Sequence, residues 1–152
     1  MQKIVPNLWF DGNAQEAVEY YVSVFADGKI ISTEYYPNSA AEGLADFQQS
    51  LAGKVLTIEF EMLGTQFVAI NAGPEFTHSE AVSFAVPCKD QDEIDYYWSK
   101  LSHVPESEQC GWCKDKFGLS WQIVPENMDE LMQKPDAFKT MMGQHKIVIA
   151  EY

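Results

Sequence analysis

Long apolar runs are missing from this sequence, and basic residues are few. No stretch approaches the roughly 20 apolar residues that cross a bilayer as a helix. The 10 Lys and Arg stand against 23 Asp and Glu, which gives a formal net charge of −13. A chain this acidic repels phosphate backbones and anionic lipid surfaces. The composition therefore favours neither a membrane protein nor a nucleic-acid-binding protein, and we expect no nucleic acid and no membrane as partner.

Cysteine is also scarce, with only Cys88, Cys110 and Cys113 present. An odd and small number argues against a disulfide framework of the kind that secreted domains use. The first residues, Met-Gln-Lys-Ile-Val-Pro, lack the charged start and apolar stretch typical of a secretory signal. We therefore expect a cytoplasmic protein.

Apolar and aromatic residues, in contrast, are plentiful. Hydrophobic residues make up 46% of the 152 positions, with 4 Trp, 7 Tyr and 9 Phe among them. That content is ample for a packed interior, so neither disorder nor metal-dependent folding is expected. The length suits one domain, or two small modules that share a core.

A weak internal repeat divides the chain. With an offset of 77 residues, Asn13 aligns with Asp90 and Glu16 with Glu93. In both stretches a short apolar strand and a turn lead into an amphipathic helix. Asn13 and Asp90 are residue types that cap helix starts, and a Glu three residues on is typical of a capping box. Strand-like runs follow each helix, and Gly64 aligns with Gly118 before the last strand of each half.

Each half therefore reads as β-α-β-β-β, which is an α+β pattern. The expected boundaries are 1–75 for the first module and 79–125 for the second, with a turn-rich linker over 71–80. Residues 126–152 would add a short helix near Asp136 to Met142 and a final strand, "HKIVIAEY". We expect these parts to form one domain together.

Two βαβββ modules in about 150 residues resemble the vicinal oxygen chelate superfamily, which includes glyoxalase I, extradiol dioxygenases and bleomycin-resistance proteins. Within it the sequence is similar to the PhnB-like branch, often labelled demethylubiquinone methyltransferase-like. The matching strings are "PNLWFDGNAQEAVEYY", "FVAINAGPEF", "AVSFAVPCKDQDEID", "CGWCKDKFGLSWQIVP" and "MMGQHKIVIA". The resemblance implies one curved eight-stranded mixed sheet around a cup, with the helices outside.

Enzymes of that superfamily usually hold a divalent metal in the cup, through His, Glu or Gln side chains. The resemblance places the four ligand positions at Pro6, Val68, Ser83 and Gln122. Two of these residues have no side-chain donor, and one carboxamide with one neutral hydroxyl cannot hold a metal. Glu59 and Glu61 share one face of their strand and are the best carboxylate pair, although alternating Glu is more often a solvated face. We therefore expect no metal and no other cofactor.

Methyl transfer also lacks its usual sequence signal. A methyl donor such as S-adenosylmethionine usually binds over a glycine-rich loop between a strand and a helix. The candidate segments "LGTQF" and "DGNAQ" are typical of a hairpin and a helix start.

The Cys110-Gly-Trp-Cys113 spacing is that of a dithiol or of half a zinc site. A reactive dithiol needs its first Cys at a helix N-terminus, whereas this motif precedes a hairpin and the strand "LSWQIVP". A structural zinc site commonly needs two such pairs. We expect structural thiols, and a disulfide or a redox or metal site stays open. If Gln122 faces the cup, alternation along the strand buries Trp121.

The expected function is the binding of a small, partly apolar molecule in the cup. A mostly apolar wall with a few hydrogen-bonding groups would line it: Pro6, Leu8, Phe10, Val68, Ile70, Ser83, Ala85, Trp112, Ser120 and Gln122. Two alternatives stay open, a metal-dependent glyoxalase- or dioxygenase-type enzyme with non-standard ligands and a structural or regulatory protein without catalysis. Because sheet edges need covering, we expect a homodimer in each case.

Overall fold

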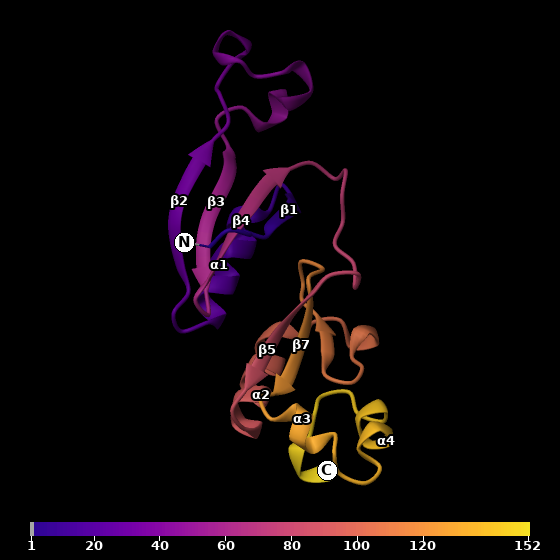
Figure 1. The fold of residues 1–152 in the computed structure, drawn as a ribbon. Helices are drawn as coiled ribbons and strands as arrows, with labels where there is room; N and C mark the ends of the chain where they lie inside the picture. The colour runs from indigo at the N-terminus through magenta and orange to yellow at the C-terminus, as the bar shows by residue number, and fades with distance from the viewer. Residues whose placement is uncertain (1) are drawn as a thin grey trace. The chain divides into compact units, whose positions relative to one another are not determined.

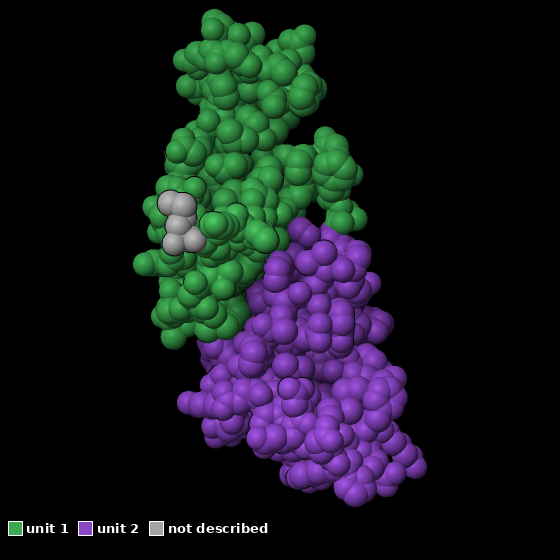
Figure 2. Space-filling model, viewed as in Figure 1, with its two compact units in different colours: residues 1–77 green, residues 78–152 purple. Residues whose placement is uncertain are grey.

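The computed structural model describes residues 2–152 of the chain, which form two compact units. The first unit spans residues 1–77 and the second spans residues 78–152, as Figure 2 shows in two colours. The sheets lie within the units, four strands in one and three in the other (Figure 1). The α+β class is confirmed, but the expectation of a single eight-stranded sheet is wrong. Among residues 2–152, no helix has the length and apolar character needed to cross a membrane.

The first unit has the predicted β-α-β-β-β order. Its sheet has the strand order β1-β4-β3-β2, with β1 and β4 parallel and the other pairs antiparallel. A two-residue turn at Leu63-Gly64, with φ of 49° and 74°, joins β3 to β4, as the hairpin signal predicts. Two short 3₁₀ helices, Ala40–Glu42 and Asp46–Leu51, lie between β2 and β3. The main elements are β1 (Asn7–Asp11), α1 (Ala14–Val24), β2 (Lys29–Tyr35), β3 (Val55–Met62) and β4 (Thr65–Ala72).

The helix α1 covers one face of the first sheet and leaves the other open. Its apolar stripe packs against β3 and β4, and Ala17, Val18 and Tyr21 are fully buried there. The start of α1 differs from the expected capping box, because the Asn13 side chain makes no cap hydrogen bond. Instead, the buried Asn71 amide oxygen accepts from the Ala14 N–H at 3.1 Å. A strand residue has taken the role that we assigned to Asn13.

The second unit has one strand fewer than the sequence predicts. Its sheet has the order β5-β7-β6, with β5 and β7 parallel. No counterpart of β2 forms after α2, where the segment "HVPESEQ" contains a proline and few apolar side chains and adopts a 3₁₀ turn at Pro105–Ser107. This unit is therefore β-α-β-β, followed by two short helices: β5 (Ser83–Cys88), α2 (Gln91–Leu101), β6 (Trp112–Lys114), β7 (Ser120–Pro125), α3 (Met128–Leu131) and α4 (Ala137–Met142).

The helix α2 begins as predicted and covers one face of its own sheet. The Asp90 carboxylate accepts from the Glu93 N–H at 2.9 Å, which satisfies one of the free donors at the helix start. Ile94 and Leu101 of this helix are fully buried, and α2 contacts all three strands. Trp121 on β7 is buried as expected, and its indole N–H donates to the buried Asp115 carboxylate at 2.9 Å.

The expected final strand does not form. Residues 145–148 are irregular, and a 3₁₀ turn at Ile149–Glu151 follows. The backbone of this tail bonds elsewhere: the Gln144 carbonyl accepts from Cys110 N at 2.8 Å, and the Gln91 amide bonds both Ile147 O and Ile149 N. Ile147 is fully buried. The apolar alternation that we interpreted as a strand reflects packing of an irregular segment.

The first unit has one residue more than the second unit between its first strand and its helix. Asn7 pairs with Val68 in the first parallel pair, and Ala85 pairs with Gln122 in the second, so the strands repeat at an offset of 78 (85 − 7). The helices begin at Ala14 and Gln91, an offset of 77 (91 − 14). Gly12, which has a φ of 74°, is the inserted residue between β1 and α1. Its left-handed conformation suits glycine best.

Candidate functional site

Five of the predicted cup residues share one face of the second sheet. Register pairs Ser83 with Ser120 and Ala85 with Gln122 between β5 and β7, and Trp112 with Gln122 between β6 and β7. Paired residues project to the same side of a sheet, and the alternate residues are those buried beneath α2. We call this side, opposite α2, the open face of the second sheet.

A polar group lies at the centre of this open face. The Gln122 amide Nε2 donates to Ser83 Oγ at 2.8 Å, which leaves the amide oxygen available as an acceptor. The Ser120 hydroxyl is buried and has no hydrogen-bond partner. A buried polar atom without a partner is costly, and Ser120 does not line the pocket described next.

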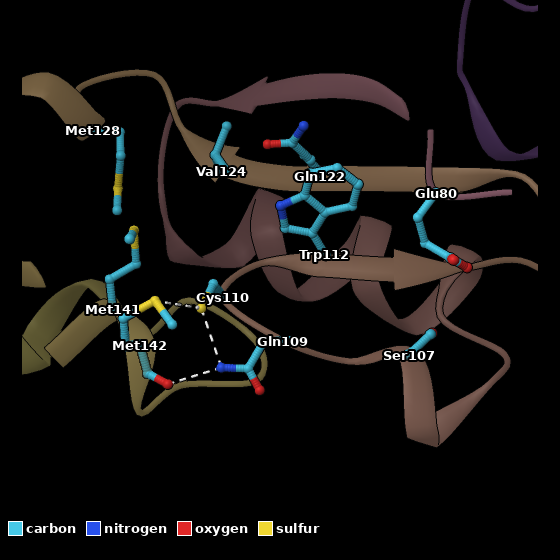
Figure 3. Close-up of a pocket in the computed structure, with 10 residues that line it drawn as sticks. All are labelled: Glu80, Ser107, Gln109, Cys110, Trp112, Gln122, Val124, Met128, Met141 and Met142. Carbon is cyan, nitrogen blue, oxygen red and sulfur yellow. Dashed lines mark hydrogen bonds between the residues drawn. The ribbon is translucent and has the colours of Figure 1, made fainter. Parts of the chain in front are cut away.

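Next to this group is a pocket of about 610 Å³, formed entirely by the second unit (Figure 3). One wall is the open face itself, with Trp112, Gln122 and Val124. The α3 and α4 region contributes three methionines, and the hairpin before β6 contributes a thiol. We call it the second-unit pocket; it is lined by Glu80, Ser107, Gln109, Cys110, Trp112, Gln122, Val124, Met128, Met141 and Met142.

An ion pair lies at this pocket. The Lys114 ammonium contacts the Glu80 carboxylate, and this hydrogen bond lowers the pKa of Glu80. Because the two charges compensate each other, the pocket has no unbalanced charge at this point.

The Cys110-Gly-Trp-Cys113 motif separates its two thiols. Cys110 and Gly111 are the central residues of a tight turn, with φ of 51° and 84°, and Gln109 and Trp112 exchange backbone hydrogen bonds across it. Cys113 lies on the α2 side of β6, where burial raises the pKa of its thiol to about 12. All three cysteines are free. The motif is a hairpin turn plus one core residue, which fits the expectation of structural thiols better than that of a dithiol site.

The first-unit residues of the predicted cup divide between two faces. Val68 and Ile70 alternate with the buried residues of β4 and lie on its open side. Leu8 and Phe10 are buried on the α1 side, so the expectation that they share a face with Val68 is wrong. Pro6 precedes β1 and contributes its carbonyl, which accepts from Val68 N at 3.0 Å. The physical reason is the insertion of Gly12, which shifts the register of β1 by one residue.

The observed register changes which residue of the first unit is equivalent to Ser83, but it brings no metal-ligating side chain to that position. At an offset of 78, the residue equivalent to Ser83 is Val5, which has no side-chain donor. Glu59 and Glu61 lie on the open face beside Val68 and Gln66, but each has a partner: Ser32 Oγ donates to Glu59 at 3.2 Å, and Lys29 is 3.4 Å from Glu61. Within residues 2–152, no group of three or more His, Cys, Asp or Glu side chains is arranged to hold a metal.

A second hollow of about 550 Å³ lies in the first unit, where Trp9, Ile70 and the exposed Phe47 are among the lining residues. Only Ile70 of the predicted site belongs to it. The second-unit pocket contains Trp112 and Gln122 and adjoins Ser83, so it is the stronger candidate.

Of the ten residues that line the second-unit pocket, the sequence predicted only Trp112 and Gln122, and the eight that it missed include three methionines, Met128, Met141 and Met142. The missed signal is the density of methionine after β7, where Met128, Met132, Met141 and Met142 fall within 15 positions. Methionine is flexible and polarisable and is common on binding surfaces that accept varied ligands.

The fold and this site define an α+β protein of two repeated units, each with a parallel strand pair, one helix over the sheet and an open opposite face. A sequence model of the family described as 3-demethylubiquinone-9 3-methyltransferase matches residues 2–124. The chain therefore belongs to this family, and its PhnB-like character is confirmed.

Solved structures agree with this assignment. The PhnB protein from Bacillus cereus is 32% identical, with a TM-score of 0.64 over 82% of this chain and 99% of its own. The protein PA1353 from Pseudomonas aeruginosa is 19% identical, with a TM-score of 0.59 over 83% of this chain and 98% of its own; at that identity the likeness concerns the fold alone. No curated protein is significantly similar in sequence.

Proposed function

We propose that this protein, as a PhnB-like member of the vicinal oxygen chelate superfamily, binds a small, partly apolar molecule in the second-unit pocket without a divalent metal. The observation that carries the proposal is the pocket itself, which is lined by the Trp112 indole, three methionine thioethers and the Gln122 carboxamide. Its volume of about 610 Å³ falls within the usual range of roughly 300–1,000 Å³ for small-molecule sites.

The lining indicates what kind of molecule would fit. Trp112 offers a flat aromatic surface, and thioethers make favourable contacts with aromatic rings. Gln122 already donates to Ser83, so its oxygen is the group left to accept a hydrogen bond. A planar, mostly apolar molecule with one N–H or O–H donor matches both features.

The proposal does not include methyl transfer. The connections from strand to helix are Gly12-Asn13 in the first unit and Lys89-Asp90 in the second. Neither is a glycine-rich loop of the kind that holds a nucleotide-like methyl donor at a helix start. The divalent-metal chemistry of the superfamily lacks its ligands for the reasons given above.

A neutral fluorescent probe tests the proposal. N-phenyl-1-naphthylamine is aromatic and carries one N–H donor, and its emission rises in apolar surroundings. We expect saturable binding to the protein at one site, and binding at least ten-fold weaker in Trp112→Ala. The matched control is Trp98→Ala, since Trp98 lies on α2 outside the pocket and is also half-buried. Equal affinity in Trp112→Ala and Trp98→Ala, with both variants folded by circular dichroism, would contradict the proposal.

The homodimer belongs to this proposal as well. β2 is an edge strand of the first sheet, and Ile30 and Ile31 on it are 43% and 44% exposed. Exposed apolar edges favour pairing with another chain. Light scattering at micromolar concentration should give twice the 17.2 kDa of the chain; a monomer would refute this part.

A further inference from the structure

Two sulfur atoms face each other at one end of the second-unit pocket. The Cys110 thiol donates a hydrogen bond to the Met142 thioether, with the sulfurs 3.6 Å apart. The Gln109 amide nitrogen joins the same two residues, since it donates to Cys110 Sγ at 3.2 Å and to the Met142 carbonyl at 2.8 Å. Figure 3 shows these three contacts beside Met128 and Met141. A thiol and a thioether are thus held side by side at one end of the pocket.

We propose that Cys110 and Met142 bind a soft monovalent cation, Cu(I) or Ag(I), with a further thioether of the same pocket completing the site. Thiolate and thioether sulfurs are soft ligands, which favour Cu(I) over hard cations such as Mg²⁺. With a metal–sulfur bond of about 2.3 Å, the length of a zinc–thiolate bond, two sulfurs 3.6 Å apart enclose an angle of about 103° at the metal. That angle lies close to the tetrahedral value, so the pair needs little movement to chelate one ion.

The charges at the site also suit a monovalent cation. Binding replaces the proton between the two sulfurs: the Cys110 S–H bond breaks, the proton passes to solvent, and a Cys110–metal bond forms. The thiolate and the cation neutralise each other, which suits an apolar pocket. The Gln109 N–H remains directed at the sulfur, and such outer contacts orient a metal ligand.

Backbone contacts fix the position of both ligands. Cys110 N donates to Gln144 O and Gly111 N donates to His145 O, each at 2.8 Å. These bonds tie the hairpin turn to the segment directly after α4, which carries Met142. A β-carbon at Gly111 would approach Ile123 O at 3.0 Å, so the turn packs closely against β7.

The other thiols of the chain do not share this geometry. Cys88 and Cys113 are buried, and burial raises the pKa of each to about 12. They stay protonated and shielded at neutral pH, which makes Cys110 the thiol that meets a cation in solution.

This inference does not depend on the proposed function, because the organic ligand and the cation are measured separately. The competing explanation is that the four sulfur side chains line the pocket only as adaptable apolar groups. That explanation predicts no preference for a soft cation beyond that of any accessible thiol.

A competition titration distinguishes the two explanations. Reduced protein is titrated with Cu(I) under anaerobic conditions against bathocuproine disulfonate, a colorimetric Cu(I) chelator. We expect one Cu(I) per chain, and an affinity at least ten-fold lower in both Cys110→Ser and Met142→Leu. Met132→Leu is the matched control, because Met132 lies near α3 but outside the pocket lining, and it should bind as the wild type does.

Two results would overturn the inference. One is a wild-type protein that binds Cu(I) no better than Cys110→Ser. The other is an unchanged affinity in Met142→Leu, which would reduce the site to a lone thiol. Melting temperatures identify any variant that fails to fold, and the second variant then decides the question.

Discussion

Replacing Gln122 by Leu tests the polar side of the pocket. The change keeps the side-chain volume similar and removes the amide that donates to Ser83 Oγ at 2.8 Å. A single neutral hydrogen bond contributes about 0.5–1.5 kcal/mol net to stability. Gln122 is half-buried, so we expect the lower part of that range. For a chain of this length, the melting temperature should change by only a few degrees.

The effect on ligand binding should be distinct from the effect on stability. If the Gln122 oxygen accepts from the N–H of N-phenyl-1-naphthylamine, losing it costs about 0.5–1.5 kcal/mol. That range corresponds to a roughly 2- to 13-fold rise in the dissociation constant. Fluorescence titration of the probe measures the constant directly, and thermal unfolding of the same samples measures stability.

Ser83→Ala is the matched control for this experiment. It removes the same hydrogen bond from the other side but leaves the Gln122 amide in place. We expect Ser83→Ala to bind the probe as tightly as the wild type or more tightly. Equal losses of affinity in Gln122→Leu and Ser83→Ala would refute the reasoning, because they would show that only the hydrogen bond between the two residues matters.

The remaining predictions concern metal and thiols. Purified, tag-free protein should carry well under one equivalent of Zn, Ni, Mn or Fe by elemental analysis, and a chelator should leave its melting temperature unchanged; stoichiometric metal would reverse the ligand argument. A thiol reagent at pH 8 should modify Cys110 in the folded protein, and Cys88 and Cys113 only after unfolding, because both are buried. These two thiols have a raised pKa of about 12 in the folded protein. Their contribution to the stability of the fold is therefore fully present at pH values below the unfolded thiol pKa of roughly 8.5. That contribution should therefore be lost between about pH 8.5 and 12, with Cys113→Ala reducing the loss seen in denaturant titrations at high pH.

The parts of the fold that were predictable from the sequence depend on local signals. The Asp90 cap, the apolar stripe of α2 and the Leu63-Gly64 turn each depend on a few adjacent residues. The alternation of side chains along a strand is a similar local signal. It placed Ser83, Ala85, Trp112, Ser120 and Gln122, which share the open face of the second sheet.

The errors arose where a distant contact decides the outcome. Gly12 changes the offset between strand and helix repeats, which no local pattern reveals, and it moves Leu8 and Phe10 to the other face. Asn71 replaces Asn13 at the start of α1, where it accepts from Ala14 N across a sequence separation of 57. The tail satisfies its backbone groups with the Cys110 turn and Gln91 instead of a sheet. Likewise, Met141 and Met142 reach the pocket only because that tail folds back onto the hairpin.

The most direct test of the binding site uses the methyl groups of methionine as reporters. Protein labelled with ¹³C at the methionine methyls is titrated with N-phenyl-1-naphthylamine and followed by nuclear magnetic resonance. We expect the resonances of Met128, Met141 and Met142, which line the pocket, to shift together and to saturate with the probe. The resonances of Met62, which is buried in the first unit, and of Met132 should not shift. Shifts confined to Met62 or Met132, or no saturable shift at the three pocket methionines, would contradict the claim that this pocket is the ligand site.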